Sequence, residues 1–255
     1  MKLHVIGSSS AGNGYVLQTD DNRECLILEC GLQFRKYAEA ISWRLTTIQG
    51  ALITHEHGDH ANFVADFHSN GIKTYSTDNT IHAMYAKYGG ISVMGTRIMG
   101  GYAPVKKREW TQIGGFSVMA ISSVHDAADP VNYIIRHPEC GDILFITDTA
   151  LFPYNAADVA NILIETNFDM ETIENLLPDK IQMSRLIQSH LSIQSAASIV
   201  GMLDNPQLRN VVLIHLSQRH GDADKFKRLM MQTTPKNVTV AEPGKTINLN
   251  SNIQF

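Results

Sequence analysis

Four side chains of the kinds that bind metal ions lie within six residues of each other. They follow the apolar run 51–53 and are His55, His57, Asp59 and His60. Imidazoles and carboxylates are good ligands for zinc and manganese. Crowding them into one turn is costly in solvation and charge repulsion unless a cation compensates. The spacing H-x-H-x-D-H therefore predicts a loop wrapped around two adjacent metal ions.

This run has two other interpretations. The helical zinc motif H-E-x-x-H is excluded, because the residue four positions after His55 is Asp59 and not a histidine. A polar surface loop that holds three histidines by chance is the structural alternative. It gives no role to the ligands that recur further along the chain.

Metal-type side chains follow other apolar segments in the same way. The strand predicted at 116–121 leads to His125, the strand at 142–146 leads to Asp148, and the strand at 211–214 runs straight into His215. Active sites of layered α/β proteins form where several strand ends converge. Taken singly, Asp148 is compatible with a turn cap and His125 with a buried core histidine. Together with the first motif, they predict a single site.

The elements that position these residues can be predicted from periodicity and turn signals. Strands are expected at 2–6, 15–18, 25–29, 50–53, 73–75, 110–113, 116–121, 132–136, 142–146, 162–167, 211–214 and 238–240. Helices are expected at 34–43, 61–70, 80–88, 170–177, 181–189, 192–203 and 223–232. This order favours two sheets with helices outside them. No linker or repeat interrupts the chain, so we expect one domain over residues 1–255.

Composition narrows the class of protein. A formal net charge of −4 over 255 residues gives no basic footprint for nonspecific binding to nucleic acid, although it leaves room for a local basic groove. Three cysteines without a C-x-x-C spacing argue against a disulfide framework. The start is typical of a strand rather than a signal peptide, and no apolar run reaches the roughly 18 residues of a membrane span. We expect a cytoplasmic protein without a membrane partner.

With these residues in view, the chain resembles the metallo-β-lactamase fold superfamily over essentially its whole length. The resemblance implies a four-layer αββα sandwich of two mixed β-sheets flanked by helices. It implies one metal held by His55, His57 and His125, and a second held by Asp59, His60 and His215, with Asp148 bridging the two. The cofactors would be two divalent ions, Zn²⁺ or Mn²⁺. True β-lactamases lack the bridging aspartate, so Asp148 implies a phosphodiesterase-type branch that attacks phosphorus with a metal-bridging hydroxide.

Finer motifs look like the small stand-alone nucleases of the WalJ (YycJ) type, at residues 7–13, 124–130, 147–149 and 165–167. Residues 213–219 are similar to the last metal motif of RNase Z. The His-Leu-Ser segment at His190 stands where RNase Z has a phosphate-contacting histidine, which implies that His190 protonates the leaving oxygen. Packing at a helix end is the alternative role for His190. Two positions depart from the pattern: Glu29 replaces the usual aspartate, and Phe168 replaces a histidine.

The expected function is hydrolysis of phosphodiester bonds in nucleic acid, with a DNA exonuclease as the leading hypothesis. Asp59 is expected to be both a ligand and essential for turnover. Three alternatives remain open: a phosphodiesterase for cyclic nucleotides or other small substrates, a thioester or lactone hydrolase, and a metal-binding regulator without turnover. Metal identity, polarity of degradation, oligomeric state and pathway are not determined by the sequence.

Overall fold

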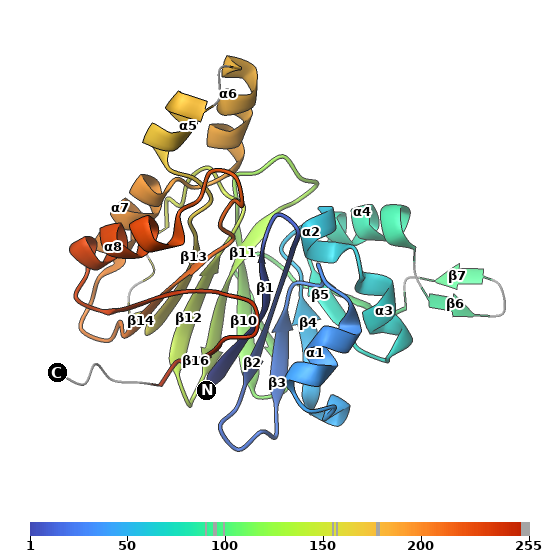
Figure 1. Cartoon of the computed structure of the whole chain (residues 1–255). Helices are drawn as coiled ribbons and strands as arrows, with labels where there is room; N and C mark the ends of the chain where they lie inside the picture. The colour runs from blue at the N-terminus through green and yellow to red at the C-terminus, as the bar shows by residue number, and fades with distance from the viewer. Residues whose placement is uncertain are drawn as a thin grey trace.

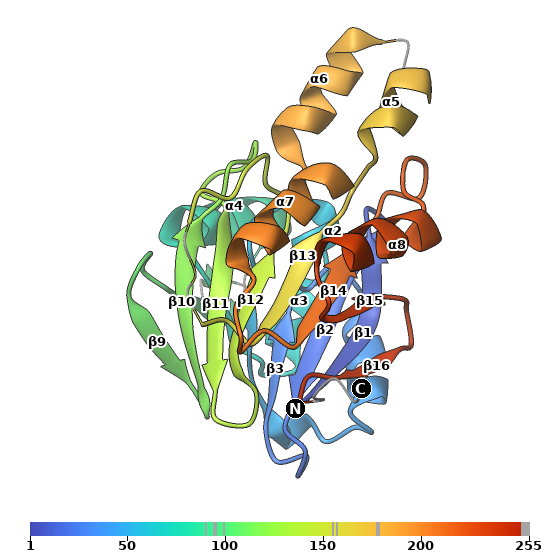
Figure 2. The ribbon, with the colours of Figure 1, turned by 90° about the vertical axis from the view of Figure 1, so that its left-hand side faces the viewer.

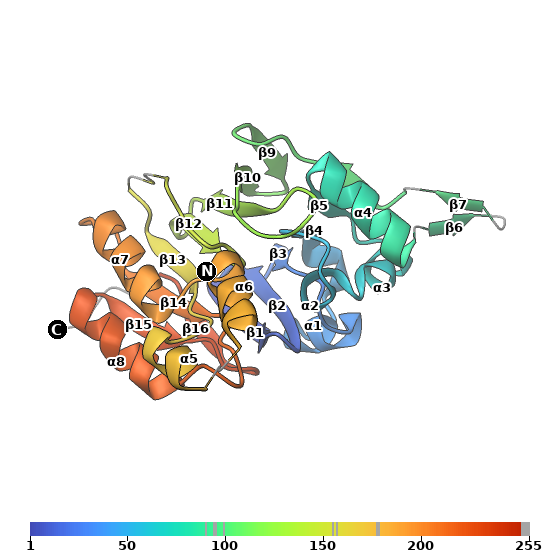
Figure 3. The same ribbon diagram turned by 90° about the horizontal axis from the view of Figure 1, so that it is seen from above.

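Two mixed β-sheets lie face to face in the computed structural model and form the centre of the molecule (Figure 1). The structure describes residues 1–89, 91–93, 96–98, 100–154, 156, 158–176 and 179–250. Helices cover the outer face of each sheet, which is plain in the view from above (Figure 3). The predicted four-layer arrangement is therefore confirmed.

The first sheet is built mainly from the N-terminal part of the chain. Its strand order is β16 (Thr246–Asn248), β1 (Lys2–Ser9), β2 (Gly12–Gln18), β3 (Cys25–Leu28), β4 (Ile48–Leu52), β5 (Thr74–Ser76) and β8 (Tyr102–Pro104). Pairs from β16 to β3 are antiparallel, and pairs from β3 to β8 are parallel. The ligand loop leaves the parallel strand β4.

The second sheet continues the chain in the same mixed style. Its strand order is β15 (Asn237–Val240), β14 (Asn210–Ile214), β13 (Asn161–Glu165), β12 (Gly141–Ile146), β11 (Val131–His137), β10 (Phe116–Ser122) and β9 (Trp110–Ile113). The strands from β12 to β15 are parallel to one another. Because β11 is antiparallel to both β10 and β12, these two strands also end at the same edge of the sheet.

Helices complete the outer layers. The first sheet is covered by α1 (Phe34–Ala40), α2 (Gly58–Ala61), α3 (Val64–Ser69) and α4 (Asp78–Tyr88), with the 3₁₀ turn η1 (Leu45–Thr47) between α1 and β4. The second sheet is covered by α7 (Ile193–Leu203) and α8 (Ala223–Thr233). Two further helices, α5 (Met170–Leu176) and α6 (Lys180–Ser189), project beyond the sheets as an arm (Figure 2). A small hairpin of β6 (Ile91–Val93) and β7 (Thr96–Ile98) extends from α4.

Apolar burial explains the layering. The core between the sheets contains the fully buried aromatic residues Tyr15, Phe116, Tyr133 and Phe145. Every residue of β13 is buried, as expected for a parallel strand covered on both faces. Such a strand can carry a polar side chain only where that side chain finds partners, and its last residue, Glu165, is the case that matters for the site.

The structure differs from the predicted elements at a few boundaries. The helix expected at 34–43 ends at Ala40, because Ser42 and Trp43 adopt left-handed backbone conformations with φ of 55° and 59°. The helix expected at 61–70 is two short helices, α2 and α3, separated at Asn62 and Phe63. The final residue of the helix expected at 170–177 lies outside the described residues. Within the described part of the chain, no helix is both long and apolar enough to cross a lipid bilayer.

Candidate metal centre

All seven predicted ligands converge at the carboxyl ends of the central strands. The loops that carry them follow β4, β10, β12 and β14. The structure brings the ligands together in two adjacent groups, each with its ligand atoms within 4.8 Å of one another: His55, His57 and His125 in the first, and Asp59, His60, Asp148 and His215 in the second. Convergence of residues this far apart in sequence is the arrangement that strand-end sites produce.

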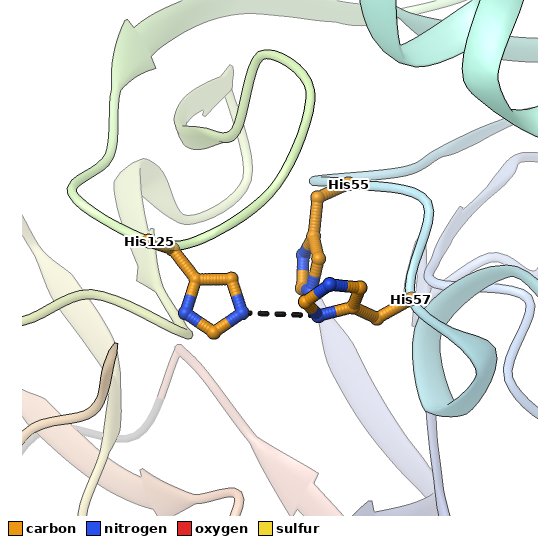
Figure 4. A group of neighbouring side chains, drawn as sticks. All are labelled: His55, His57 and His125. Carbon is orange, nitrogen blue, oxygen red and sulfur yellow. Dashed lines mark hydrogen bonds between the residues drawn. The ribbon is translucent and has the colours of Figure 1, made fainter. Parts of the chain in front are cut away.

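The first group consists of three imidazoles that point toward a common centre (Figure 4). His125 Nδ1 lies 2.8 Å from the Ser189 carbonyl oxygen, which can only accept, so Nδ1 donates and Nε2 keeps its lone pair. That Nε2 lies 3.1 Å from His57 Nδ1. Two nitrogens bound to one tetrahedral zinc at its usual bond length are separated by roughly 3.3 Å, so this spacing suits a shared ion. His55 Nε2 is buried and has no hydrogen-bond partner among the described residues.

The second group combines two imidazoles with two carboxylates and is almost entirely buried. His60 Nε2 lies 3.2 Å from Asp59 Oδ2 and 3.3 Å from Asp148 Oδ1. His215 Nε2 lies 3.3 Å from Asp59 Oδ2 but, within the described structure, makes no hydrogen bond. Burying carboxylates and unsatisfied ring nitrogens together is unfavourable unless a cation binds them. The donor set of both groups therefore fits divalent metal ions.

Asp148 lies between the two groups and presents one carboxylate oxygen to each. Its Oδ2 is 3.7 Å from His55 Nε2 and 3.6 Å from His125 Nε2, in the first group. Its Oδ1 is 3.3 Å from His60 Nε2 and 2.8 Å from His215 Nδ1, in the second. The geometry is that of a carboxylate placed to bridge two ions.

Glu29 orients the second group from behind. Its side chain is fully buried, and its Oε1 lies 3.3 Å from His60 Nδ1 while accepting a hydrogen bond of 2.6 Å from Thr54 Oγ1. A carboxylate on the far nitrogen of an imidazole sets its tautomer and makes it a better ligand. Where the resemblance led us to expect an aspartate, Glu29 supplies a carboxylate from a left-handed backbone conformation with φ of 65°.

Glu165 is the site residue to which sequence reasoning assigned no role. Its Oε1 is 2.6 Å from His190 Nδ1 and 3.0 Å from His215 Nδ1, so it contacts both a predicted ligand and the predicted acid. Its Oε2 accepts hydrogen bonds from the backbone amides of Leu191 and Thr149. The sequence pattern that marks the ligands also marks Glu165, because it stands at the carboxyl end of the apolar strand β13.

Local backbone conformation shows how tightly the loops are arranged. Asp148 and His215, like Glu29, have positive φ angles, of 46° and 53°. Such conformations are unfavourable for residues with a Cβ and persist where the surroundings impose them. Gly31 serves a different purpose: a Cβ at this position would lie 1.8 Å from the Asp59 carbonyl oxygen, so only glycine lets the ligand loop pack there.

The pKa shifts of the histidines have opposite directions in the two groups. Burial lowers the pKa of His55 well below its ordinary value and also lowers that of His125. In the second group burial is the largest single influence and opposes protonation, but the surrounding carboxylates together outweigh it. Asp148 contributes most among them, and the pKa of both His60 and His215 is raised well above the ordinary value. The same imidazoles hold the pKa of Asp148 well below its usual range, although burial opposes this shift.

His190 lies at the end of α6, on the wall of the cavity that opens onto the metal groups. This cavity has a volume of about 410 Å³ and is also lined by His57, Asp148 and Arg185. Burial disfavours the charged form of His190, yet Glu165 and, to a smaller extent, Asp148 together raise the pKa of the imidazole above its ordinary value. The predicted acid is therefore adjacent to the ligands and placed to hold a proton.

Two other histidines, His68 and His82, lie away from these groups. His68 is buried, pairs with Thr74 Oγ1 at 2.8 Å and packs edge-on against Tyr102. Burial lowers the pKa of His68 to about 4. His82 makes a 2.7 Å contact with the carbonyl oxygen of Asp78 on its own helix.

Comparison with known proteins identifies the family. Residues 26–216 match the family described as the beta-lactamase superfamily domain, and because this match spans most of the chain, the protein belongs to that superfamily. It has the metallo-β-lactamase fold. The class of protein that this superfamily indicates is a metal-dependent hydrolase. No curated protein matches the chain by sequence.

Several solved structures share this fold at low sequence identity. Zn²⁺-bound PqqB from Methylobacterium extorquens has a TM-score of 0.70 and 13% identity, covering 97% of this chain and 100% of its own. A diphosphatase from the PhnP family has a TM-score of 0.68 and 13% identity, covering 96% of both chains. Human tRNase Z, short form (ELAC1), has a TM-score of 0.64 and 15% identity, covering 98% of this chain and 99% of its own. At these identities the likeness establishes the fold alone.

Proposed function

We propose that this protein is a metal-dependent phosphodiesterase acting on nucleic acid, most specifically a DNA exonuclease of the WalJ type. The observation that supports the proposal most directly is the position of Asp148, with one oxygen toward each ligand group. A bridging aspartate holds two ions close together, which is the arrangement suited to phosphoryl chemistry. The diphosphatase and the tRNase Z with the same fold are consistent with this chemistry.

Zinc or manganese ions, when bound, would supply the Lewis acidity that activates a water molecule and neutralises phosphate charge. His55, His57 and His125 would hold one ion, and Asp59, His60 and His215 the other, with Asp148 shared. Asp59 is then essential for turnover as a ligand, because its Oδ2 lies within 3.3 Å of both His60 Nε2 and His215 Nε2.

The leaving oxygen requires a proton, and His190 is the group that can supply it. Its Nδ1 is directed at Glu165 Oε1, which leaves Nε2 as the ring nitrogen available to a substrate. Although burial opposes it, Glu165 helps to raise the pKa of His190, which favours the protonated imidazole that a general acid requires. A positioned acid of this kind contributes about a hundredfold or more to rate.

The α5–α6 arm adds a cation to a cavity that is otherwise rich in carboxylates and imidazoles. Arg185 and Gln182 line this cavity from α6. Arg185 is exposed, and no side-chain hydrogen bond or ion pair joins its guanidinium to any described residue. A free guanidinium beside a phosphodiesterase centre is suited to binding a phosphate next to the scissile bond. In a chain of net charge −4, such a local cation is the means of attracting a polyanion.

A smaller substrate is the second candidate. The cavity of about 410 Å³ is large enough for a nucleotide, and the acidic balance of the chain does not favour long polyanions. A cyclic nucleotide phosphodiesterase would use the same ligands and the same acid.

A substrate panel separates these functions. The full chain, loaded with Mn²⁺ or with Zn²⁺, should degrade end-labelled linear DNA from its ends and leave covalently closed circular DNA intact. The variant H190N should retain its metals and lose about a hundredfold in kcat, whereas H82N, on the exposed face of α4, should match the wild type. Hydrolysis of cyclic nucleotides alone would support the second candidate, and inactivity on every phosphodiester with either metal would overturn the proposal.

A further inference from the structure

Asn13, which is not among the predicted ligands, has its side chain against the second ligand group. Its Nδ2 lies 3.2 Å from Asp59 Oδ2 and 3.2 Å from His60 Nε2. The residue is only 1% exposed, so its carboxamide is buried inside the site. Both neighbouring atoms are donors to the same expected ion, and the carboxamide therefore borders the position of that ion.

The backbone holds Asn13 firmly at this distance. It lies in β2 opposite Ser8 of β1, and its carbonyl oxygen accepts hydrogen bonds from the Gly31 amide at 3.1 Å and from the Tyr37 hydroxyl at 3.3 Å. The side chain has only two rotatable bonds beyond this anchored position. Its reach toward the site is consequently fixed, and the remaining freedom is which end of the amide faces the ligands.

A half-turn of the carboxamide exchanges its NH₂ group for Oδ1. The NH₂ group suits the carboxylate of Asp59, but it is a poor neighbour for a cation. The carbonyl oxygen is the opposite: it is a hard donor of the kind that Mn²⁺ and Mg²⁺ prefer. Binding of an ion at the second group therefore favours the orientation with Oδ1 inward.

The surroundings accept either orientation. The Tyr15 hydroxyl lies 3.5 Å from Asn13 Oδ1 and 2.8 Å from Ser8 Oγ, and in the latter pair either atom can be the donor. Ser8 Oγ also accepts the backbone amide of His215. When Ser8 donates to Tyr15, the phenol can donate to Oδ1. When Tyr15 donates to Ser8, the phenol oxygen is left to accept from the NH₂ group of the turned amide.

We propose that Asn13 Oδ1 is an additional ligand of the ion bound by Asp59, His60, Asp148 and His215. This ligand gives the second group three oxygen donors beside its imidazoles, whereas the first group consists of imidazoles with one oxygen of Asp148. The second site then prefers an ion of higher coordination number, such as Mn²⁺, and the first remains suited to tetrahedral Zn²⁺. The inference rests on metal binding at the second group and not on the substrate of the proposed function.

Calorimetric titration of the metal-free full chain with Mn²⁺ tests the inference without an activity assay. N13A should weaken the tighter of the two Mn²⁺ sites by about tenfold and leave the other unchanged, since one oxygen ligand is lost from the second site only. N13D should bind Mn²⁺ at least as tightly as the wild type, because a carboxylate oxygen replaces the amide oxygen. N70A, an exposed asparagine on the same sheet's helical layer, is the matched control and should change neither site.

The aspartate variant separates ligation from simple positioning of Asp59. If the NH₂ group only donates to Asp59, N13D places two carboxylates together and should bind Mn²⁺ more weakly than N13A, which would overturn the inference. An unchanged Mn²⁺ affinity in N13A would also overturn it. Should N13A fold poorly, N13S carries the same prediction in a polar, smaller side chain. Two Mn²⁺ sites in a wild type without phosphodiesterase activity would contradict the proposed function while leaving this test intact.

Discussion

The two ligand groups of this metal centre are adjacent, yet they are built on different principles. The first consists of imidazoles alone, and two of its three members, His57 and His125, are partly exposed where the cavity opens. The second contains two carboxylates and is buried except for Asp59. Behind it lie two more buried carboxylates, Glu29 and Glu165, each directed at a ring nitrogen of a ligand.

This difference indicates which of the two groups depends more strongly on a bound cation. Burial lowers the pKa of His55 and of His125, which favours the neutral, metal-binding form of both imidazoles. In the second group, carboxylates raise the pKa of His60 and His215, because buried negative charge must be balanced by protons when no metal is bound. The second group thus requires positive charge, either as protons or as a metal ion. Changes to Glu29 and Glu165, which contact its histidines, should therefore affect metal binding at the second group selectively.

The largest effect is expected where the two groups meet. D148N keeps the shape of the side chain but removes the charge that both groups share. We expect kcat to fall by about a thousandfold, the equivalent of roughly 4 kcal/mol, and both metals to bind more weakly. Steady-state kinetics and metal content per chain measure the two effects. If only one metal is affected, Asp148 belongs to one group and the bridging role is wrong.

Glu165 should couple the second group to the acid. E165Q removes the charge that raises the pKa of His190 and supports His215. We expect kcat to fall by about a hundredfold and metal affinity to fall by about tenfold at the second site only. Kinetics paired with a metal titration check this. A loss of affinity at the first site instead would show that the two groups are not separately supported.

Glu29 should act on the second group without involving the acid. In E29Q the hydrogen bond from Thr54 can persist, while the charge facing His60 Nδ1 is lost. Metal affinity at the second site should fall by about tenfold, and kcat at saturating metal should stay within a factor of a few. The same titration gives the affinity. A fall in saturated kcat as large as that of E165Q would remove the distinction between the two supporting carboxylates.

The smallest effect is expected for His68, a buried histidine whose pKa is shifted by burial and not by a neighbouring carboxylate. Its folded pKa of about 4 is below its unfolded value near 6.5, so the unfolded chain binds the proton more readily as pH falls through this range. The unfolding free energy should therefore decrease between pH 6.5 and pH 4, by about 1–2 kcal/mol more in the wild type than in H68Q. Urea unfolding of the metal-free proteins across this range measures the difference. Parallel pH profiles would contradict it.

The sequence predicted the site residues that are marked by a local pattern, and it did not predict those whose role depends on contacts between distant parts of the chain. His125, Asp148 and His215 were accessible because each follows an apolar strand, and parallel strand ends meet in space. Asn13 closes the motif at residues 7–13, but its contact with the ligand loop was not predicted, because that contact joins residues 46 positions apart in sequence. The break between α2 and α3 was likewise missed, because the apolar spacing there is continuous. The Phe63 amide at the break donates to the Cys30 carbonyl oxygen, a contact between distant residues that spacing does not reveal.

The central claim is a pair of metal sites joined by Asp148, and anomalous diffraction from crystals of the Mn²⁺- and Zn²⁺-loaded protein tests it most directly. We predict two peaks, one among His55, His57 and His125 and one among Asp59, His60 and His215, with a carboxylate oxygen of Asp148 bound to each ion. A single peak, or two peaks of which one lies away from Asp148, would contradict this account.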